Sequence, residues 1–298
     1  MLTEEQTQFY ADNGYVVVKG LLTKEEAAAY RQEAHALMER LTRLREQEVD
    51  ATWGSAANGA KKTQLLHCHD VQFQAAAFSR LLLNDRLTSV AADILGPNVQ
   101  LHHSKMFIKP PEKGSPFPLH QDAPFFPHEQ HSMIAAIVHF DDAPLEKGCV
   151  CVVPGSHKQG MLPHIQDGSW HLPTDEFPID MAMPLPAEAG DAVFFSYLTI
   201  HGSGINVSNE ARTTVLIQMR DPADPPSLRT HESRGQGMML AGIDPTGEKT
   251  VSVDRTQNAD GTMAEGQAAS TERHGATHPV LAGAMGGAMS GGMTAGRM

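Results

Sequence analysis

The fold class is decided by residues 192–219, which read AVFFSYLTIHGSGINVSNEARTTVLIQM. Apolar and β-branched residues fill the two ends of this stretch and predict strands at residues 192–201 and 213–219, and Gly202-Ser203-Gly204 turn the chain between them. Similar apolar runs occur earlier in the chain, at residues 99–108, 133–140 and 149–153. Short strands separated by Pro and Gly, with no helix-length periodic segment between them, are typical of an antiparallel sandwich or barrel. We therefore predict a mainly β fold with a jelly-roll core at about residues 99–226.

The residues before this core have a helical pattern. Capping-box spacing at Thr3-Glu4-Glu5-Gln6 and again at Thr23-Lys24-Glu25-Glu26 predicts a short helix and then a longer one that continues to about Glu48. A third helix is expected at residues 79–95, where a Gly-Pro pair stops it. Residues 1–98 are therefore predicted to supply α-helices that flank the β core.

The length and composition suit one large domain. The chain has 298 residues, of which 41% are hydrophobic and 19% are charged, so it can bury a core of its own. We place this domain at residues 1–245. Residues 50–63 lack periodicity and are expected to form a loop. Residues 246–298 are so rich in Gly, Ala and Met that they bury little surface, and we expect a mobile tail there.

The charge balance excludes several classes of partner. Asp and Glu total 35 against 23 Lys and Arg, for a formal net charge of -12, so we expect no nucleic-acid partner, which would require a basic face. No apolar run approaches the roughly 18 residues of a membrane helix, and the 3 cysteines form no disulfide framework. We expect a cytoplasmic protein whose partner is a small molecule. No charge pattern identifies an oligomer interface.

An H-x-D motif offers two metal ligands. His120 and Asp122 are two residues apart, so on an extended strand their side chains project from the same face. A second H-x-D, His139-Phe140-Asp141, leads into Asp142-Ala143-Pro144, which turn chemistry explains better. We therefore assign the metal to the first pair and expect His139 to be a wall or core histidine.

A third ligand is expected from a distant strand, and His201 at the end of an apolar run is the natural choice. Two imidazoles and one carboxylate on one face of an iron leave coordination positions open for other ligands. On the next strand, alternation places Arg212, Thr214 and Gln218 on one face. A guanidinium can grip a carboxylate through two parallel hydrogen bonds. The pattern predicts a metal site beside a carboxylate site.

Together these motifs resemble the phytanoyl-CoA dioxygenase family of iron(II)- and 2-oxoglutarate-dependent oxygenases. The similarity runs from about Leu2 to Pro226. The matching stretches are KPP at residues 109–111, PLHQD at 118–122, FDDA at 140–143, PGSH at 154–157, and the segment from His201 to Arg212. The resemblance implies a double-stranded β-helix core and makes residues 1–245 a single oxygenase domain.

The resemblance also implies cofactors and the residues that hold them. It implies iron(II) on His120, Asp122 and His201, and the cosubstrate 2-oxoglutarate on Arg212, Ser203 and Lys105. Arg212 and Ser203 would hold the distal carboxylate, and Lys105 would contact the keto-acid end. Dioxygen would be the oxidant. The implied reaction is hydroxylation of an unactivated C–H bond of a small organic substrate, with release of succinate and carbon dioxide. Halogenating relatives replace the carboxylate ligand by a small residue, so Asp122 argues against halogenation.

The substrate is expected to meet the aromatic loop after the H-x-D motif. Phe125 and Phe126 would enclose the site and exclude water, and His128 and His139 are further candidates for substrate contact. Residues 229–237 follow the core and are candidates to fold back over its mouth.

A function from another class is also open. The same residues could form a non-redox, cupin-like metal-binding module, either an isomerase or a sensor of a carboxylate ligand. The family resemblance does not select a substrate, because function belongs to the site rather than to the fold. Lys109, Lys113 and Lys158 are candidates for a small surface patch that would suit the phosphates of a CoA thioester.

Overall fold

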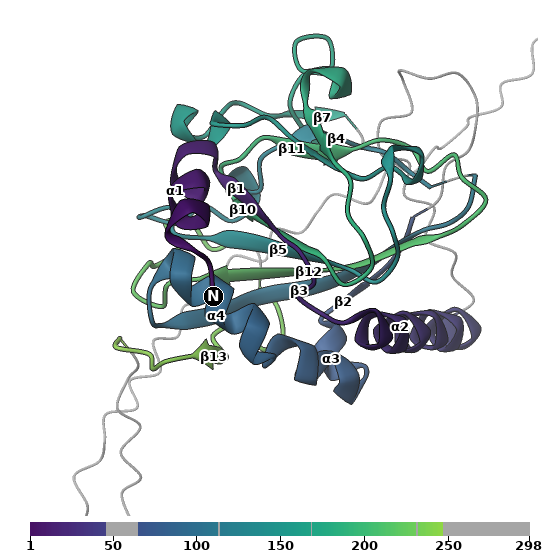
Figure 1. Cartoon of the computed structure of the whole chain (residues 1–298). Helices are drawn as coiled ribbons and strands as arrows, with labels where there is room; N and C mark the ends of the chain where they lie inside the picture. Colours follow the sequence, from purple (N-terminus) through teal and green to yellow (C-terminus); the bar gives the residue numbers. More distant parts are fainter. Residues whose placement is uncertain (46–64, 113, 168, 231, 247–298) are drawn as a thin grey trace, which may run out of the picture. The chain divides into compact units, whose positions relative to one another are not determined.

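The chain folds around two antiparallel β-sheets that lie one above the other in Figure 1. The computed structural model describes residues 1–45, 65–112, 114–167, 169–230 and 232–246. Within them the larger sheet is 7-stranded, in the order β1-β10-β5-β12-β3-β13, and β2 also pairs with β3. The smaller sheet has the order β4-β11-β6-β9, and β7 pairs with β8 in a separate hairpin. This arrangement confirms the mainly β, jelly-roll prediction.

The elements have the following bounds. The helices are α1 (Glu4–Asn13), α2 (Lys24–Arg45), α3 (Ala76–Leu82) and α4 (Asp85–Leu95). The strands of the larger sheet are β1 (Tyr15–Val18), β2 (Leu66–His69), β3 (Val99–Lys109), β5 (Ile134–His139), β10 (Ala192–Ser196), β12 (Arg212–Arg220) and β13 (Met239–Ala241). Those of the smaller sheet are β4 (Phe117–His120), β6 (Val150–Val152), β9 (Met183–Leu185) and β11 (His201–Ser203), and the hairpin is β7 (Ile165–Asp167) with β8 (Ser169–His171).

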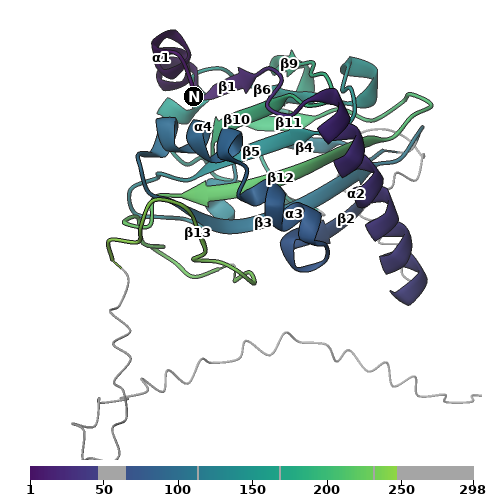
Figure 2. The same cartoon turned by 60° about the horizontal axis from the view of Figure 1, so that its bottom comes forward.

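Helices α2, α3 and α4 cover the outer face of the larger sheet, as Figure 2 shows, which confirms the flanking N-terminal helices. Phe78 and Leu87 from these helices share one buried core with Val215 and Ile217 of β12. Because side chains alternate along a strand, the other face of β12 turns toward the smaller sheet. The helices therefore bury the apolar face of β12 and leave its Arg- and Gln-bearing face for the interior between the sheets.

The first two helices begin where their capping boxes predict. The Thr3 hydroxyl accepts a hydrogen bond from Gln6 N at 3.2 Å, and Glu26 N donates to the Thr23 hydroxyl at 3.1 Å. Helix α1 ends at Gly14, whose φ of 77° is a left-handed conformation that suits glycine. The predicted end of the second helix near Glu48, the predicted loop at residues 50–63 and all but the first residue of the predicted tail lie outside the described residues.

Two sequence predictions of long elements are wrong. The helix predicted at residues 79–95 is two helices, because the Asn84 side chain accepts hydrogen bonds from Arg86 N and Leu87 N and so caps a new helix at that point. The strand predicted at residues 192–201 is also divided. β10 ends at Ser196 in the larger sheet, Thr199 N donates to the Ser196 carbonyl at 2.8 Å in a turn, and β11 begins in the smaller sheet.

No helix in the described part of the chain combines the length and the apolar content that crossing a membrane requires.

Asp191 anchors the turn before β10. Its carboxylate accepts hydrogen bonds from Lys19 Nζ at 2.7 Å, Glu188 N at 2.8 Å and Gly20 N at 2.9 Å. Burial alone would raise the pKa of Asp191, but the Lys19 contact and the backbone hydrogen bonds outweigh burial and lower it. The resulting stabilisation is fully present at pH values above the ordinary aspartate pKa of about 3.9. It is lost as the pH falls through the lowered pKa of Asp191 in the folded state.

We expect Asp191→Ala to lower the free energy of unfolding by about 2 kcal/mol at neutral pH, the range for hydrogen bonds to a charged group. Urea denaturation at pH 7 and in acid measures the effect, and the deficit of the variant should shrink in acid. Glu188→Ala is the control, because its carboxylate is exposed and pairs with the equally exposed Lys24, so a change within about 0.5 kcal/mol is expected. A deficit that is equal at both pH values would contradict this account.

Candidate active site

Three potential metal ligands converge between the two sheets. His120 ends β4 and His201 begins β11, and the two residues face each other in the pairing of these strands. The Asp122 Oδ1 atom lies 3.7 Å from His120 Nε2 and 3.8 Å from His201 Nε2. All three side chains are buried, and their ligating atoms lie within 4.8 Å of one another. This spacing suits three ligands on one face of a single metal ion.

The H-x-D pair reaches this point in a different way from the one predicted. Only His120 is on a strand, whereas Asp122 has helical backbone angles (φ -77°, ψ -25°) at the start of a short turn. Asp122 N donates to the Tyr197 carbonyl at 2.9 Å, which ties this turn to the segment before β11. The carboxylate therefore meets the imidazoles from a turn rather than from the same face of a strand.

Hydrogen bonds fix how the ligands present themselves. His120 Nδ1 lies 2.8 Å from the Pro118 carbonyl, and His201 Nδ1 lies 3.0 Å from the Thr199 carbonyl. Because a carbonyl only accepts, each Nδ1 carries the proton and each Nε2 keeps a lone pair for a metal.

The carboxylate is held in the same way. Gln218 Nε2 donates to Asp122 Oδ2 at 2.6 Å, so Oδ1 remains free to bind a metal. Burial lowers the pKa of His120 well below its usual range and raises the pKa of Asp122. Both shifts reflect the cost of burying charge, which a bound cation offsets for the carboxylate.

These ligands form one wall of a cavity of about 400 Å³. Lys105, Phe107, Thr214 and Leu216 line it from the larger sheet. Phe125 and Phe126 also line it, and the Phe125 ring lies 5.7 Å from the half-exposed Trp170 ring. The structure thus brings the two predicted phenylalanines to the metal cavity.

The two histidines predicted to contact the substrate, His128 and His139, are not among the described residues that line the metal cavity. His139 is fully buried at the end of β5 and is absent from the described lining of the cavity. Its backbone N–H donates to the Asp191 carbonyl at 2.9 Å, and burial lowers the pKa of its imidazole ring to about 3. It is a core histidine, as the alternative interpretation of the second H-x-D expected. His128 lines an adjoining cavity instead.

One end of the metal cavity is lined by Arg212 and Ser203, and a second buried cation, Lys109, lies behind Ser203. Arg212 and Lys109 are cross-strand neighbours on β12 and β3, with exposed fractions of 3% and 0%. Lys109 Nζ donates to Ser203 Oγ at 2.7 Å and to the Gly204 carbonyl at 2.6 Å, and Arg212 Nη1 donates to the Gly148 carbonyl. Within the described residues neither cation has a carboxylate in ion-pair range.

The buried positive charges of Arg212 and Lys109 favour the binding of an anion beside them. Burial lowers the pKa of Arg212 to about 10, and burial followed by the charge of Arg212 lowers the pKa of Lys109. Arg212 Nε is buried and has no hydrogen-bond partner in the described chain. A carboxylate bound here would satisfy this donor and offset both charges.

The glycine at position 148 allows this arrangement. It has a φ of 66°, and a Cβ atom there would lie 2.3 Å from the Gly204 carbonyl oxygen. Any side chain would therefore displace the backbone that accepts the hydrogen bond of Arg212.

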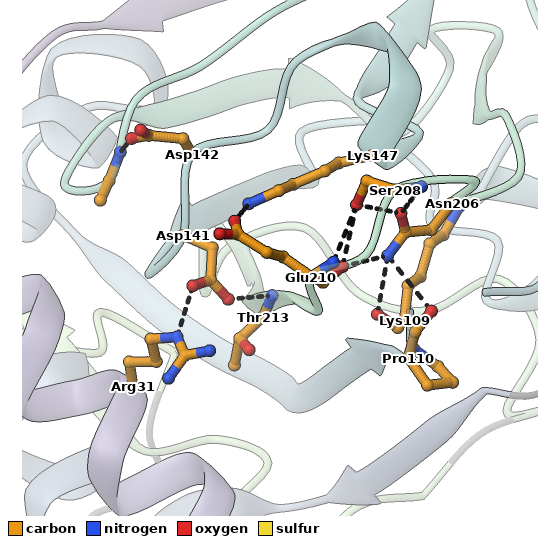
Figure 3. A network of polar contacts seen from close by, with 11 residues as sticks. Arg31, Lys109, Pro110, Asp141, Asp142, Lys147, Asn206, Ser208, Glu210 and Thr213 are labelled. Carbon is orange, nitrogen blue, oxygen red and sulfur yellow. Dashed lines mark hydrogen bonds and ion pairs between the residues drawn. The ribbon is translucent and has the colours of Figure 1, made fainter. Parts of the chain in front are cut away.

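Sequence reasoning missed the role of Lys109 and was wrong to place it on a surface patch. Asn206 Nδ2 donates to the carbonyls of Lys109 and Pro110 at 3.2 Å each, which holds the end of β3 against the β11–β12 connection (Figure 3). The only sequence signal was its place in the KPP motif. Lys105, by contrast, was selected and does line the cavity, where its Nζ lies 4.9 Å from the Phe107 ring centre and burial lowers its pKa to about 8.

Comparison with known proteins identifies the family. The family model of phytanoyl-CoA dioxygenase (PhyH) matches residues 10–214. The chain belongs to the phytanoyl-CoA dioxygenase family. The peroxisomal phytanoyl-CoA dioxygenase of Mus musculus is 31% identical over 238 residues, which span 72% of this chain and 67% of the mouse protein. The ectoine dioxygenase of Bordetella parapertussis is 29% identical over 256 residues, which span 76% of this chain and 78% of that protein.

A solved structure with a similar fold agrees with this family assignment. The epimerase SnoN, solved in complex with Fe3+, alpha ketoglutarate and nogalamycin RO, is 26% identical with a TM-score of 0.61, and the similarity covers 81% of this chain and 96% of SnoN. The protein is therefore an iron- and 2-oxoglutarate-dependent enzyme of the phytanoyl-CoA dioxygenase family. Its donor set of two imidazoles and a carboxylate fits iron, and its buried cation pair fits a dicarboxylate. The family favours an oxygenase over the non-redox module.

Proposed function

We propose that this phytanoyl-CoA dioxygenase relative is a hydroxylase of a small organic molecule. One C–H bond of the substrate becomes C–OH, and 2-oxoglutarate and dioxygen become succinate and carbon dioxide together with the inserted oxygen atom. The observation that supports this proposal is the shared cavity, whose lining includes the three metal ligands and the buried cation Arg212, with Lys109 behind the lining residue Ser203. Iron and 2-oxoglutarate supply the oxidising chemistry when bound.

The protein residues bind and orient. His120, Asp122 and His201 would hold iron(II) through Nε2, Oδ1 and Nε2. Arg212 and Ser203 would hold the distal carboxylate of 2-oxoglutarate, and Lys105 would reach its keto-acid end. Phe125, Phe126 and the neighbouring apolar side chains would exclude water and so protect the oxidant from side reactions.

Lys109 has a positioning role in this proposal. An ammonium has no acceptor, so in the 2.7 Å contact it is the Ser203 oxygen that accepts. The hydroxyl proton of Ser203 is then free to donate to the cosubstrate carboxylate. Lys109 thus sets the direction of the Ser203 hydroxyl.

The extent of the domain and its location are part of the proposal. The oxygenase domain would span residues 1–245. A cytoplasmic location is supported by the three cysteines, Cys68, Cys149 and Cys151, which are buried as thiols rather than joined in disulfides.

The test is the coupling of succinate release to oxygen insertion. With iron(II), ascorbate and 2-oxoglutarate, the purified protein should release succinate slowly alone and faster with compounds from a small-molecule library. Mass spectrometry of the stimulating compound should show the gain of one oxygen atom. The similarity to the epimerase SnoN favours one competitor, stereochemical inversion, which would leave the mass of the compound unchanged. Succinate release without a product heavier by one oxygen would contradict the hydroxylase proposal.

A further inference from the structure

A second cavity adjoins the metal cavity. It has a volume of about 430 Å³ and shares two lining residues, Phe126 and Thr230, with the first. The Thr230 hydroxyl donates to the Phe125 carbonyl, so the segment after the β core joins the aromatic loop at the boundary between the cavities. The proposed reaction leaves this second space without a role.

Three buried polar atoms that belong to lining residues of the second cavity have no hydrogen-bond partner in the described chain. They are Gln100 Oε1, His128 Nε2 and Arg220 Nε. Gln100 and His128 have exposed fractions of only 3% and 2%. Buried polar groups are normally paired, because leaving one unpaired forfeits its hydrogen bonds to water. Three such atoms on one cavity indicate a missing partner with polar groups of its own.

The chemistry of that partner follows from what each atom offers. His128 Nδ1 lies 2.8 Å from the Phe126 carbonyl and must donate to it, so Nε2 is an acceptor. Gln100 Nε2 donates to Asp244 Oδ2 at 3.2 Å, so the free Oε1 atom is also an acceptor. Arg220 Nε is a donor. The partner therefore needs hydroxyl or amine donors for two acceptors and an oxygen acceptor for one donor.

The charges on the wall limit the partner further. Two arginines, Arg220 and Arg229, are matched by two carboxylates, Glu232 and Asp244, among the described lining residues. A balanced wall attracts neutral or zwitterionic groups and gives no net attraction to a polyphosphate such as that of CoA.

The two paired strands β3 and β12 place the second cavity on the far side of the metal ligands from the cation pair. Lys109 pairs with Arg212 at one end of the ladder, and Gln100 pairs with Arg220 at the other. Gln218, which holds the Asp122 ligand, lies between these ends. It is two residues from Arg220, or about 7 Å along the strand. A molecule could thus place one carbon near the metal and a polar end in the second cavity while 2-oxoglutarate occupies the cation end.

We propose that the second cavity binds the far end of the substrate, and that this end is an uncharged or zwitterionic group rich in hydroxyls or amines, such as a sugar or an amino alcohol. The inference rests on the proposed hydroxylase function. The reacting C–H bond would lie in the first cavity among Phe107, Phe125 and Leu216. Small rotations of these side chains toward the cavity would let Gln100 and His128 accept hydrogen bonds from the polar end and let Arg220 donate one.

The test uses the full chain loaded with nickel(II) and 2-oxoglutarate, which prevents turnover. The probes are n-alkyl β-D-glucosides from butyl to octyl, each paired with its permethylated ether, which has the same alkyl chain but no hydroxyl donor. Calorimetry measures the dissociation constants. At least one glucoside should bind about tenfold or more tightly than its ether, the equivalent of about one hydrogen bond. This comparison needs no variant and so does not depend on how variants fold.

Variants then locate the preference. In His128→Phe and Gln100→Leu the preference for the glucoside should fall below about threefold, whereas His128→Gln, which keeps an acceptor, should retain most of it. Arg220→Met should weaken the same glucoside about tenfold. The matched control Arg80→Met changes an exposed arginine of α3 and should behave as wild type.

The outcomes separate this inference from the proposed function. If the wild-type protein does not bind 2-oxoglutarate, the proposed function itself is wrong. If the wild type binds 2-oxoglutarate but every glucoside binds no better than its ether, the inference about the second cavity is wrong. It is equally wrong if the preference survives unchanged in His128→Phe and Gln100→Leu.

Discussion

Asp122→Ala is expected to abolish metal binding and, with it, 2-oxoglutarate turnover. The variant keeps His120 and His201 but loses the only anionic ligand of the set, so iron(II) has two neutral donors in a buried place. Succinate release should fall at least about a thousandfold, in the range seen when one member of a catalytic unit is removed. Metal content after loading and succinate release, measured on the same sample, check the result. Turnover equal to that of the wild type would refute the metal assignment.

The second H-x-D motif supplies a matched control. Asp141 accepts a hydrogen bond from Thr213 N at 2.9 Å and pairs with Arg31 of α2 (Figure 3), so its carboxylate joins a helix to the sheet rather than binding a metal. Asp141→Ala should therefore lower the free energy of unfolding by about 2 kcal/mol while the folded protein binds one metal ion per chain. Loss of metal from folded Asp141→Ala would mean that sequence and geometry have selected the wrong motif.

The two H-x-D motifs show how much of the metal site can be predicted from the sequence alone. The spacing alone occurs twice, and context favoured His120 because His139 runs into a turn. The structure agrees with the choice but not with its reasoning, since Asp122 approaches from a turn that the Tyr197 carbonyl holds. Such a contact joins residues far apart in sequence, and no local spacing reveals it.

Local signals predicted local features well. The capping boxes at Thr3 and Thr23 mark helix starts because all their hydrogen bonds lie within four residues. The same kind of signal at Asn84 was overlooked, and one predicted helix became two. The apolar run that contains β10 passes from the larger sheet to the smaller one. Its residues are apolar before and after the turn at Ser196, because they are buried in both places, so composition does not reveal where the first strand ends.

The burial of Lys109 lay beyond sequence reasoning for a clear physical reason. Lysine is almost never fully buried unless it is paired, so a surface position was the natural expectation. Its partners, Ser203 and the Gly204 carbonyl, are 94 and 95 residues away in the chain. Only the packing of β3 against β11 brings them together.

The cation end of the cavity yields the second large effect. We expect Arg212→Met to weaken 2-oxoglutarate binding about 100-fold, because a buried, charge-assisted contact to the distal carboxylate is lost. Lys109→Met should weaken it about tenfold, as should Ser203→Ala, because the lysine acts by turning the serine hydroxyl toward the carboxylate. Anaerobic titration of the iron(II)-loaded protein, followed by the visible absorption band that forms when the keto acid chelates the metal, gives these affinities.

A second keto acid separates positioning from general structural damage. 2-Oxopentanoate has the same chain but a methyl group in place of the distal carboxylate, so its weaker binding should be the same in wild type, Lys109→Met and Arg212→Met. The double variant Lys109→Met/Ser203→Ala should bind 2-oxoglutarate no more weakly than the poorer single variant, because both changes remove one shared hydrogen bond. If both keto acids lose affinity equally, Lys109 only supports the fold. If the two losses multiply, Lys109 and Ser203 act on the carboxylate independently, and the orienting contact between them has no part in cosubstrate binding.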